Sequence, residues 1–166
     1  MLDAVQENGK NTVLRVAGGW VRDKLMGKES DDIDIALDNM FGEEMAELVR
    51  LKNFEQDVKS GKIKPDAAKP KGYGVIKANS DKSKHLETAV CKVMGEWIDL
   101  VNLRSEEYGE DSRVPKIEIG TPEQDALRRD LTFNSLFYNI NTGQIEDLTG
   151  KGVEDLKNGI VRTPLA

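Results

Sequence analysis

Apolar and polar residues follow one another along this chain in patterns that predict short strands alternating with helices. Residues 12–17, TVLRVA, are β-branched and apolar, as in a buried strand, and Gly18-Gly19 separates them from a short helical run over residues 20–26. Residues 32–37, DIDIAL, alternate acidic and apolar positions with period two, which predicts a strand with one apolar face. A helix is expected next, because the apolar residues that follow have helical spacing: Phe41, Met45, Leu48 and Val49.

The middle of the chain predicts a loop and a β-hairpin. Residues 57–84 hold eight lysines together with glycines and prolines, which is typical of a solvated loop, here around a short strand at 73–77. Residues 85–93 and 97–103 have the pattern of two hairpin strands joined by a turn at Met94-Gly95-Glu96. Residues 104–120 are polar and have no clear period, so we expect a loop there.

The last part of the chain contains a clear helix start. Thr121 suits an N-cap, Pro122 the first helical position and Gln124 the third-residue partner of a capping box. The helix is expected to continue, because apolar residues recur on one face: Leu127, Leu131 and Tyr138. Residues 138–148 then predict a hairpin that turns at Thr142-Gly143, and residues 152–159 predict a short closing helix.

Length, composition and charge narrow the classes of protein. A chain of 166 residues suits one domain with a core of its own, and no apolar run is long enough to span a membrane, so we expect a soluble protein. A net charge of −6 disfavours a nucleic-acid binder that relies on a basic surface alone. The single cysteine, Cys91, allows no internal disulfide, which suits a reducing compartment. With only one cysteine and one histidine, His85, a zinc site is disfavoured.

The acidic pattern in DIDIAL carries the most distinctive chemistry of the chain. Asp32 and Asp34 lie two positions apart on a predicted strand, so both carboxylates project from one face. The pair repels itself unless a cation lies between, and Mg²⁺ prefers such hard oxygen ligands. An EF-hand calcium loop fails, because Ala36 and Leu37 stand where that loop needs an oxygen ligand and a glycine. A D-x-D in an acidic protein is more often a solvated strand edge, so the motif needs support from its context.

The Gly18-Gly19 turn supplies part of that context. Glycine lets a backbone approach a ligand closely, and Arg22, one helical turn later, can reach an anion bound at the turn. The spacing matches neither the dinucleotide-binding fingerprint nor the P-loop, so both of those sites are disfavoured. A structural turn alone is the commoner explanation of a Gly-Gly pair.

Four segments, spread over nearly the whole chain, together resemble one enzyme family. The first is RVAGGWVRDKLMGKESDDIDIAL at residues 15–37, and the second is DALRRDLTFNSLFYNI at residues 125–140, which has the form R-R-D-[FL]-T-x-N. The others are KHLETAVCKVMGEWIDLVNLR at residues 84–104 and EDLTGKGVEDLKNGIVRT at residues 146–163. In combination they resemble the class II tRNA nucleotidyltransferases, the CCA-adding enzymes and related poly(A) polymerases of the polymerase-β superfamily, and most closely the eukaryotic members.

The resemblance implies an α/β (α+β) fold, a polymerase-β-like nucleotidyltransferase head with a small mixed β-sheet and flanking helices. It implies an enzyme that uses Mg²⁺ and adds C, C and A from CTP and ATP to the 3′ end of tRNA without a template. Asp32 and Asp34 would be the metal ligands, and Asp99 a third catalytic carboxylate from a neighbouring strand; an exposed hairpin acid is the alternative for Asp99. The resemblance assigns nucleotide binding to a further set: Gly18, Gly19, Arg22, Arg128, Arg129, Asp130 and Asn134.

The chain departs from the family pattern at its C-terminal end. The family selects the incoming base with an acidic-Asp-x-x-Arg-x-x-Arg helix that follows the head, whereas this chain ends at VRTPLA. Residues 125–128, DALR, copy part of that pattern, but their neighbours place them in the R-R-D motif. We therefore expect residues 1–150 to form the head and residues 151–166 to begin a connection to a neck, body and tail that are absent and that carry much of the tRNA contact.

Other functions remain open at this point. A poly(A) polymerase-type or other nucleotidyltransferase of the superfamily would share these motifs, and so would a nucleotide-binding module without catalysis. The resemblance also implies that residues 105–120 form a mobile loop that helps the enzyme change from C to A addition. We expect an intracellular protein of the cytoplasm, nucleus or mitochondrion, with no membrane contact.

Overall fold

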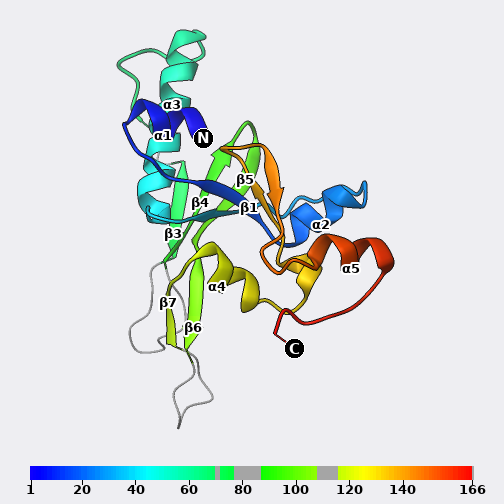
Figure 1. Cartoon of the computed structure of the whole chain (residues 1–166). Coiled ribbons are helices and arrows are strands. Elements are labelled where there is room, and N and C mark those ends of the chain that lie inside the picture. The colour runs from blue at the N-terminus through cyan, green and yellow to red at the C-terminus, as the bar shows by residue number, and fades with distance from the viewer. Residues whose placement is uncertain (70–71, 77–86, 108–115, 166) are drawn as a thin grey trace.

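The computed structural model describes residues 1–69, 72–76, 87–107 and 116–165 (Figure 1). In chain order the elements are α1 (Leu2–Glu7), β1 (Leu14–Ala17), α2 (Gly19–Leu25), β2 (Asp34–Leu37), α3 (Gly42–Lys59), β3 (Tyr73–Ile76), β4 (Thr88–Val93), β5 (Glu96–Asn102), β6 (Arg104–Glu107), β7 (Lys116–Ile119), α4 (Pro122–Leu127), the 3₁₀ helix η1 (Thr132–Asn134), β8 (Phe137–Asn139), β9 (Gln144–Glu146) and α5 (Gly152–Asn158).

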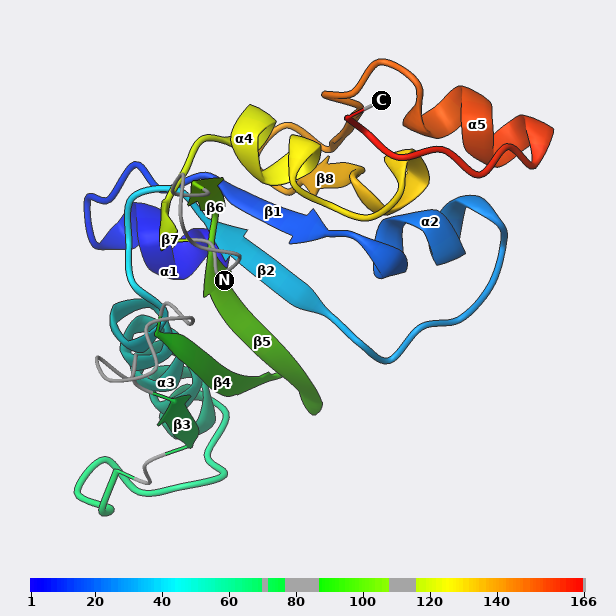
Figure 2. The same cartoon turned by 90° about the horizontal axis from the view of Figure 1, so that it is seen from below.

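A mixed β-sheet forms the centre of the fold. Its seven strands lie in the order β3-β4-β5-β2-β1-β8-β9, and β6 pairs with β7 in a separate two-stranded sheet (Figure 2). Strands β2 and β5 are parallel, and the other neighbouring pairs are antiparallel. The predicted fold class, a small mixed sheet with flanking helices, is confirmed.

The two faces of the sheet differ because side chains alternate along each strand. On β2, Ile35 and Leu37 enter the main core, which α3 covers with Met45, Ala46 and Val49. Their neighbours point the other way, and Ala36 joins a smaller cluster that is completed by Leu103, Ala126 and Phe137, among others. We call this second side the acid face, because it also carries Asp34 on β2 and Asp99 on β5. Asp34 and Asp99 lie outside this apolar cluster and are partly exposed.

Most of the strand and helix predictions are confirmed. The two strand-helix units in the first 59 residues, the short strand near residue 73, the hairpins turning at Met94-Gly95 and Thr142-Gly143, and the closing helix are all present. The capping box is also present, since Gln124 N–H donates to Thr121 Oγ1 over 3.2 Å and Thr121 N–H donates to Gln124 Oε1 over 2.9 Å. The strand predicted from residue 85 begins at Thr88 among the described residues, so Glu87 lies outside it, while residues 85–86, which include His85, lie outside the described residues.

Two predictions need correction here, and one helix was missed. Strand β2 begins at Asp34, so Asp32 lies in the preceding segment and not on the strand. The loop expected over residues 104–120 contains two paired strands, β6 and β7, whose joining residues 108–115 lie outside the described residues. Helix α1 was not predicted from the sequence; its Ala4 and Val5 are buried against the core.

The helix expected to run on to Tyr138 ends at Leu127. Leu131 has an extended backbone, and its N–H donates to the Asp130 carboxylate over 2.8 Å, which replaces a helical hydrogen bond. Tyr138 lies in strand β8, where it pairs with Val16 of β1. The apolar spacing that looked helical is therefore produced by a helix, a 3₁₀ turn and a strand in succession, and long-range strand pairing determines the outcome.

Candidate active site

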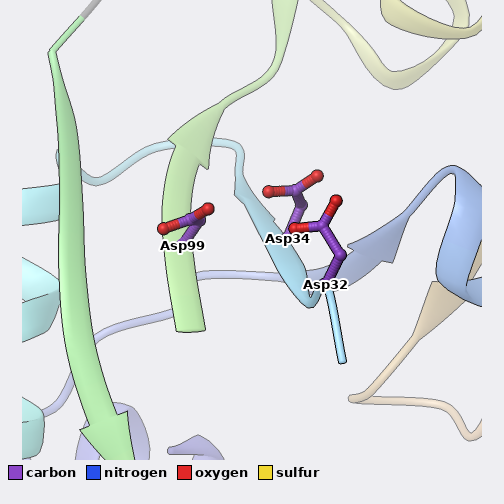
Figure 3. Close-up of side chains that lie close together, drawn as sticks. All are labelled: Asp32, Asp34 and Asp99. Carbon is purple, nitrogen blue, oxygen red and sulfur yellow. The ribbon is translucent and has the colours of Figure 1, made fainter. Parts of the chain in front are cut away.

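Three carboxylates from neighbouring segments meet on the acid face. Asp34 begins β2 and lies directly opposite Asp99 on the parallel strand β5, while Asp32 comes two residues before Asp34. The N–H of Asp99 donates to the carbonyl of Ile33 over 3.0 Å, which fixes the two strands at this level. One oxygen from each of the three carboxylates lies within 4.8 Å of the other two (Figure 3). The structure thus brings together all three acids that the sequence suggested.

The electrostatics of this cluster favour a bound cation. Burial raises the pKa of Asp34, and the negative charges of Asp32 and Asp99 raise it further, while Arg129 and Arg104 act in the opposite direction. Burial and then Asp32 also raise the pKa of Asp99. Each shift records the energetic cost of burying a carboxylate and, to a smaller extent, of holding like charges together. Three hard oxygen donors with this repulsion suit a divalent metal ion, and these residues therefore fit the metal site that the sequence predicted.

The glycine turn lies under two arginine side chains. Gly18 has φ +68°, in the left-handed region, and its N–H donates to the carbonyl of Leu136. A Cβ atom at Gly18 would lie 2.8 Å from Nη1 of Arg129, and one at Gly19 would lie 3.4 Å from Nη2 of Arg22. Glycine is favoured at position 18 by its backbone angle, and a side chain there would also displace the end of the Arg129 side chain.

Arg22 is held by residues from the distant R-R-D motif. Its Nη1 donates to Oδ1 of Asn134 over 2.7 Å, and its Nε donates to the neighbouring Asp23 over 2.8 Å. The side-chain amide of Asn134 in turn donates to Asp130 over 3.1 Å. The two motifs, separated by more than one hundred residues, therefore form one hydrogen-bonded chain beside the glycine turn.

Asp125 organises the remaining arginines. This carboxylate is only 1% exposed, and it accepts hydrogen bonds from Nε of Arg129 over 2.9 Å, from Nη2 of Arg128 over 3.1 Å and from the backbone N–H of Arg104 over 2.8 Å. Arg129 also lies over the ring of Phe137, with 5.4 Å between its guanidinium carbon and the ring centroid. Buried ion pairs of this kind hold the guanidinium groups in fixed directions.

The structure separates the predicted nucleotide-binding residues into two groups. One group surrounds the glycine turn: Gly18, Gly19, Arg22, Arg129, Asp130 and Asn134. Arg128 does not reach the turn, because its guanidinium faces Asp125 and Glu106. Arg128 and Arg129 both line a cavity of about 390 Å³ between β6, α4 and residues 163–165, so Arg129 connects the two groups. Sequence reasoning gave Asp125 no such anchoring role and missed Arg104; the only signal for Arg104 was its position directly after the strand of Asp99.

Comparison with known proteins identifies the family. The family described as the poly A polymerase head domain matches residues 14–162, which include the acids, the glycine turn and the arginines. This chain belongs to the poly A polymerase head domain family. Among relatives, the mitochondrial CCA tRNA nucleotidyltransferase of Saccharomyces cerevisiae is 53% identical over 92% of this chain. The tRNA nucleotidyltransferase cca1 of Schizosaccharomyces pombe is 48% identical over 96% of it.

Solved structures show the same head-domain fold. One described as a CCA-adding enzyme in an apo form matches 98% of this chain and 33% of its own, with a TM-score of 0.63 and 26% identity. A second structure, of a tRNA nucleotidyltransferase complexed with a primer tRNA and an incoming ATP analog, matches 96% of this chain and 37% of its own with a TM-score of 0.56. Its sequence identity is 22%, so it supports the fold alone. The chain spans 27% of the S. cerevisiae relative and 30% of the S. pombe relative. In the described part of the chain, no helix has both the length and the apolar character needed to cross a membrane.

Proposed function

We propose that this chain is the catalytic head of an enzyme that adds C, C and A to the 3′ end of tRNA from CTP and ATP. The observation that carries the proposal is the meeting of Asp32, Asp34 and Asp99 on one face of the sheet, beside a glycine turn covered by arginines. Membership of the head-domain family and about 50% identity to two named tRNA nucleotidyltransferases support the choice of reaction.

In this proposal Asp32 and Asp34 hold Mg²⁺, and Asp99 is the third catalytic carboxylate. When bound, the metal would supply charge neutralisation at the triphosphate and would make the attacking RNA hydroxyl more acidic. Asp99 lies beside the metal ligands on the parallel strand, where its oxygens can accept a hydrogen bond or the proton from that hydroxyl.

The other residues of the site would bind and orient the triphosphate. Arg22 and Arg129 lie over the glycine turn, and Asn134 and Asp125 hold their guanidinium groups in place. Guanidinium groups fixed in this way bind phosphate oxygens without having to be ordered on binding. These contacts do not reach a base, so the site as described would select for a triphosphate and not for cytosine or adenine.

The proposal extends to domains, partners and location. Residues 1–150 would form the head and residues 151–166 would begin the connection to further domains, through which most tRNA contacts would be made. The carboxylate of Asp155 accepts a hydrogen bond from the hydroxyl of Thr132 and forms an ion pair with Arg162. The bond to Thr132 attaches this last segment to the head. An intracellular location is proposed, with the mitochondrion favoured over the cytoplasm and nucleus because the S. cerevisiae relative is named a mitochondrial protein.

A chimera tests the proposed activity. This chain would replace the corresponding 152 residues of the S. cerevisiae relative, and the product would be assayed with tRNA lacking its CCA end, labelled CTP, labelled ATP and Mg²⁺. Addition of three nucleotides, lost in an Asp34→Asn variant, is the expected result. A long A tail would identify a poly(A) polymerase instead. A chimera that binds CTP but incorporates nothing would indicate a binding module, and it would refute the catalytic proposal.

A further inference from the structure

Arg104 differs from the other arginines in the described parts of the chain, because its guanidinium has no carboxylate partner there. Each of the others forms an ion pair within 4.0 Å: Arg15 with Glu146, Arg22 with Asp23, Arg50 with Glu47, Arg128 and Arg129 with Asp125, and Arg162 with Asp155. The side chain of Arg104 makes no hydrogen bond to any described residue, and its Nε is fully buried. Nε of Arg128 is buried without a partner as well, so Arg104 is set apart by its two Nη groups, which are not fully buried and donate to no described residue. These groups can donate to a bound anion.

The backbone of Arg104 is fixed on three sides. Its N–H donates to the buried carboxylate of Asp125, and it pairs with Ile119 of β7. The backbone of Gly120 packs so closely that a Cβ atom there would lie 2.6 Å from the carbonyl carbon of Arg104. The start of the side chain is thus held in place before any ligand arrives, which lowers the entropic cost of binding.

Positive and negative groups balance around Arg104 while the acid cluster holds no cation. Burial lowers the pKa of Arg104, and Arg128 and Arg129 lower it further, while Asp125 and Asp34 raise it. Asp125 is shared by Arg128 and Arg129, and Glu106 lies 3.4 Å from Arg128. Three guanidinium groups, those of Arg104, Arg128 and Arg129, thus face three carboxylates, those of Asp125, Glu106 and Asp34. A cation held by the acid cluster would offset the charge of Asp34 and favour an additional anion beside it.

We propose that Arg104 is an anion-binding residue of this site and that its guanidinium binds a phosphate group of the substrate on the acid face. The inference rests on the proposed function for the nature of that substrate. The phosphate would come from the nucleoside triphosphate or from the RNA backbone, and both offer oxygens that accept hydrogen bonds from a guanidinium. Arg104 thereby becomes a substrate-binding residue in addition to those over the glycine turn.

Binding by calorimetry tests this role with three probes. The probes are inorganic tripolyphosphate, CTP and a short RNA that ends in CC, each with Mg²⁺. Arg104→Gln should weaken the binding of the phosphate source by about tenfold or more, the range expected for loss of a charge-assisted hydrogen bond. Arg50→Gln is the matched control, because it removes the same charge from an arginine on α3.

The pattern of losses identifies the source of the phosphate. Weaker binding of both tripolyphosphate and CTP assigns Arg104 to the triphosphate, whereas weaker binding of the RNA alone assigns it to the RNA backbone. Affinities equal to those of the Arg50→Gln control for all three probes overturn the inference. If the unaltered chain binds none of the probes, the proposed function fails as well. If it binds all of them and Arg104→Gln does so equally, only the role of Arg104 fails.

Thermal stability separates ligand binding from a structural role. Without ligand, Arg104→Gln should leave the melting temperature unchanged or raise it, because the substitution removes a partly buried cation from beside two others. A structural arginine would give the opposite result, a lower melting temperature with unchanged affinity. If Arg104→Gln does not fold, Arg104→Lys replaces it, since this variant keeps the charge and loses the planar fork. Reduced affinity at an unchanged melting temperature supports the inference, and unchanged affinity at a lower melting temperature overturns it.

Discussion

Replacing Asp34 with Asn should stabilise the metal-free protein, because it removes one charge from a cluster of three. The carboxylate oxygens lie within 4.8 Å of one another. Two unit charges at that separation repel by about 3.5 kcal/mol at an effective dielectric constant near 20. Partial exposure of the acids and the attraction of Asp34 to Arg129 and Arg104 reduce this cost. We expect the Asn variant to be more stable by about 1–2 kcal/mol in the absence of metal.

Thermal unfolding with and without Mg²⁺ measures both the repulsion and the metal binding. For a domain of this size about 1 kcal/mol corresponds to roughly 2–4 °C, so the metal-free melting temperature should rise by about 2–8 °C. Asp31→Asn is the matched control, since Asp31 is exposed and lies outside the cluster. Added Mg²⁺ should stabilise the unaltered protein and the control but not Asp34→Asn, because the variant has lost a ligand.

The same variant should change the dependence of stability on pH. Because burial and the neighbouring acids raise the pKa of Asp34, the folded protein binds this proton more readily than the unfolded chain. The corresponding stability is present at low pH and is lost as pH rises through the raised pKa. The advantage of Asp34→Asn should therefore be small at low pH and grow across that range. A variant less stable than the unaltered protein at pH 7 without metal, or one that Mg²⁺ stabilises equally, would refute the reasoning.

Three further predictions concern the turn, base selection and the cysteine. Gly18→Ala should lower the free energy of unfolding by about 1–2 kcal/mol, because the backbone of Gly18 is left-handed, and it should also weaken CTP binding. Gly27→Ala, with φ +69° and open space around it, should lower stability equally without affecting CTP binding; denaturation and calorimetry compare the two variants. The chain should bind CTP, ATP, GTP and UTP alike within about threefold, and tenfold preference for CTP and ATP would place base selection within these residues. Cys91, which is 1% exposed and whose pKa burial raises to about 11, should resist iodoacetamide at pH 8 until the protein is unfolded, as mass spectrometry would detect.

The sequence predicted those parts of the fold whose signals are local. Three such signals are the alternation in DIDIAL, the capping box at Thr121 and the glycine at each hairpin turn. Each acts between residues a few positions apart, so the strand, the helix start and the turns could be predicted from the sequence. Strands β6 and β7 were missed because RSEE is polar, the alternation in KIEI covers only four residues, and the two strands pair with each other across residues 108–115. The helix predicted beyond Leu127 failed for the same kind of reason, since pairing of β8 with β1 overrides the local spacing.

The acids of the site were predictable, whereas the arrangement of the arginines was not. Asp32 and Asp34 share a period-two pattern, and Asp99 lies on an apolar strand of its own, so each gave a signal in the sequence. Asp125 gave none, because an acidic residue in the first turn of a helix is common and its burial depends on tertiary packing. Only the structure shows that Asp125 binds the side chains of Arg128 and Arg129 and accepts a hydrogen bond from the backbone of Arg104, the first residue of β6.

The overall charge of the chain was a poor guide to its local electrostatics. A net charge of −6 argues against a basic surface, yet the described residues place three arginines around one buried carboxylate beside three repelling acids. A triphosphate with its metal ion carries both signs of charge, so a site that binds it needs anionic and cationic groups side by side. Buried Asp125 makes this possible, because it holds the side chain of Arg129 and the backbone of Arg104, and both guanidinium groups act on Asp34 at little change in net charge. The distribution of charge over the acid face is therefore more relevant to function than the net charge of the chain. This distribution depends on the packing around Asp125.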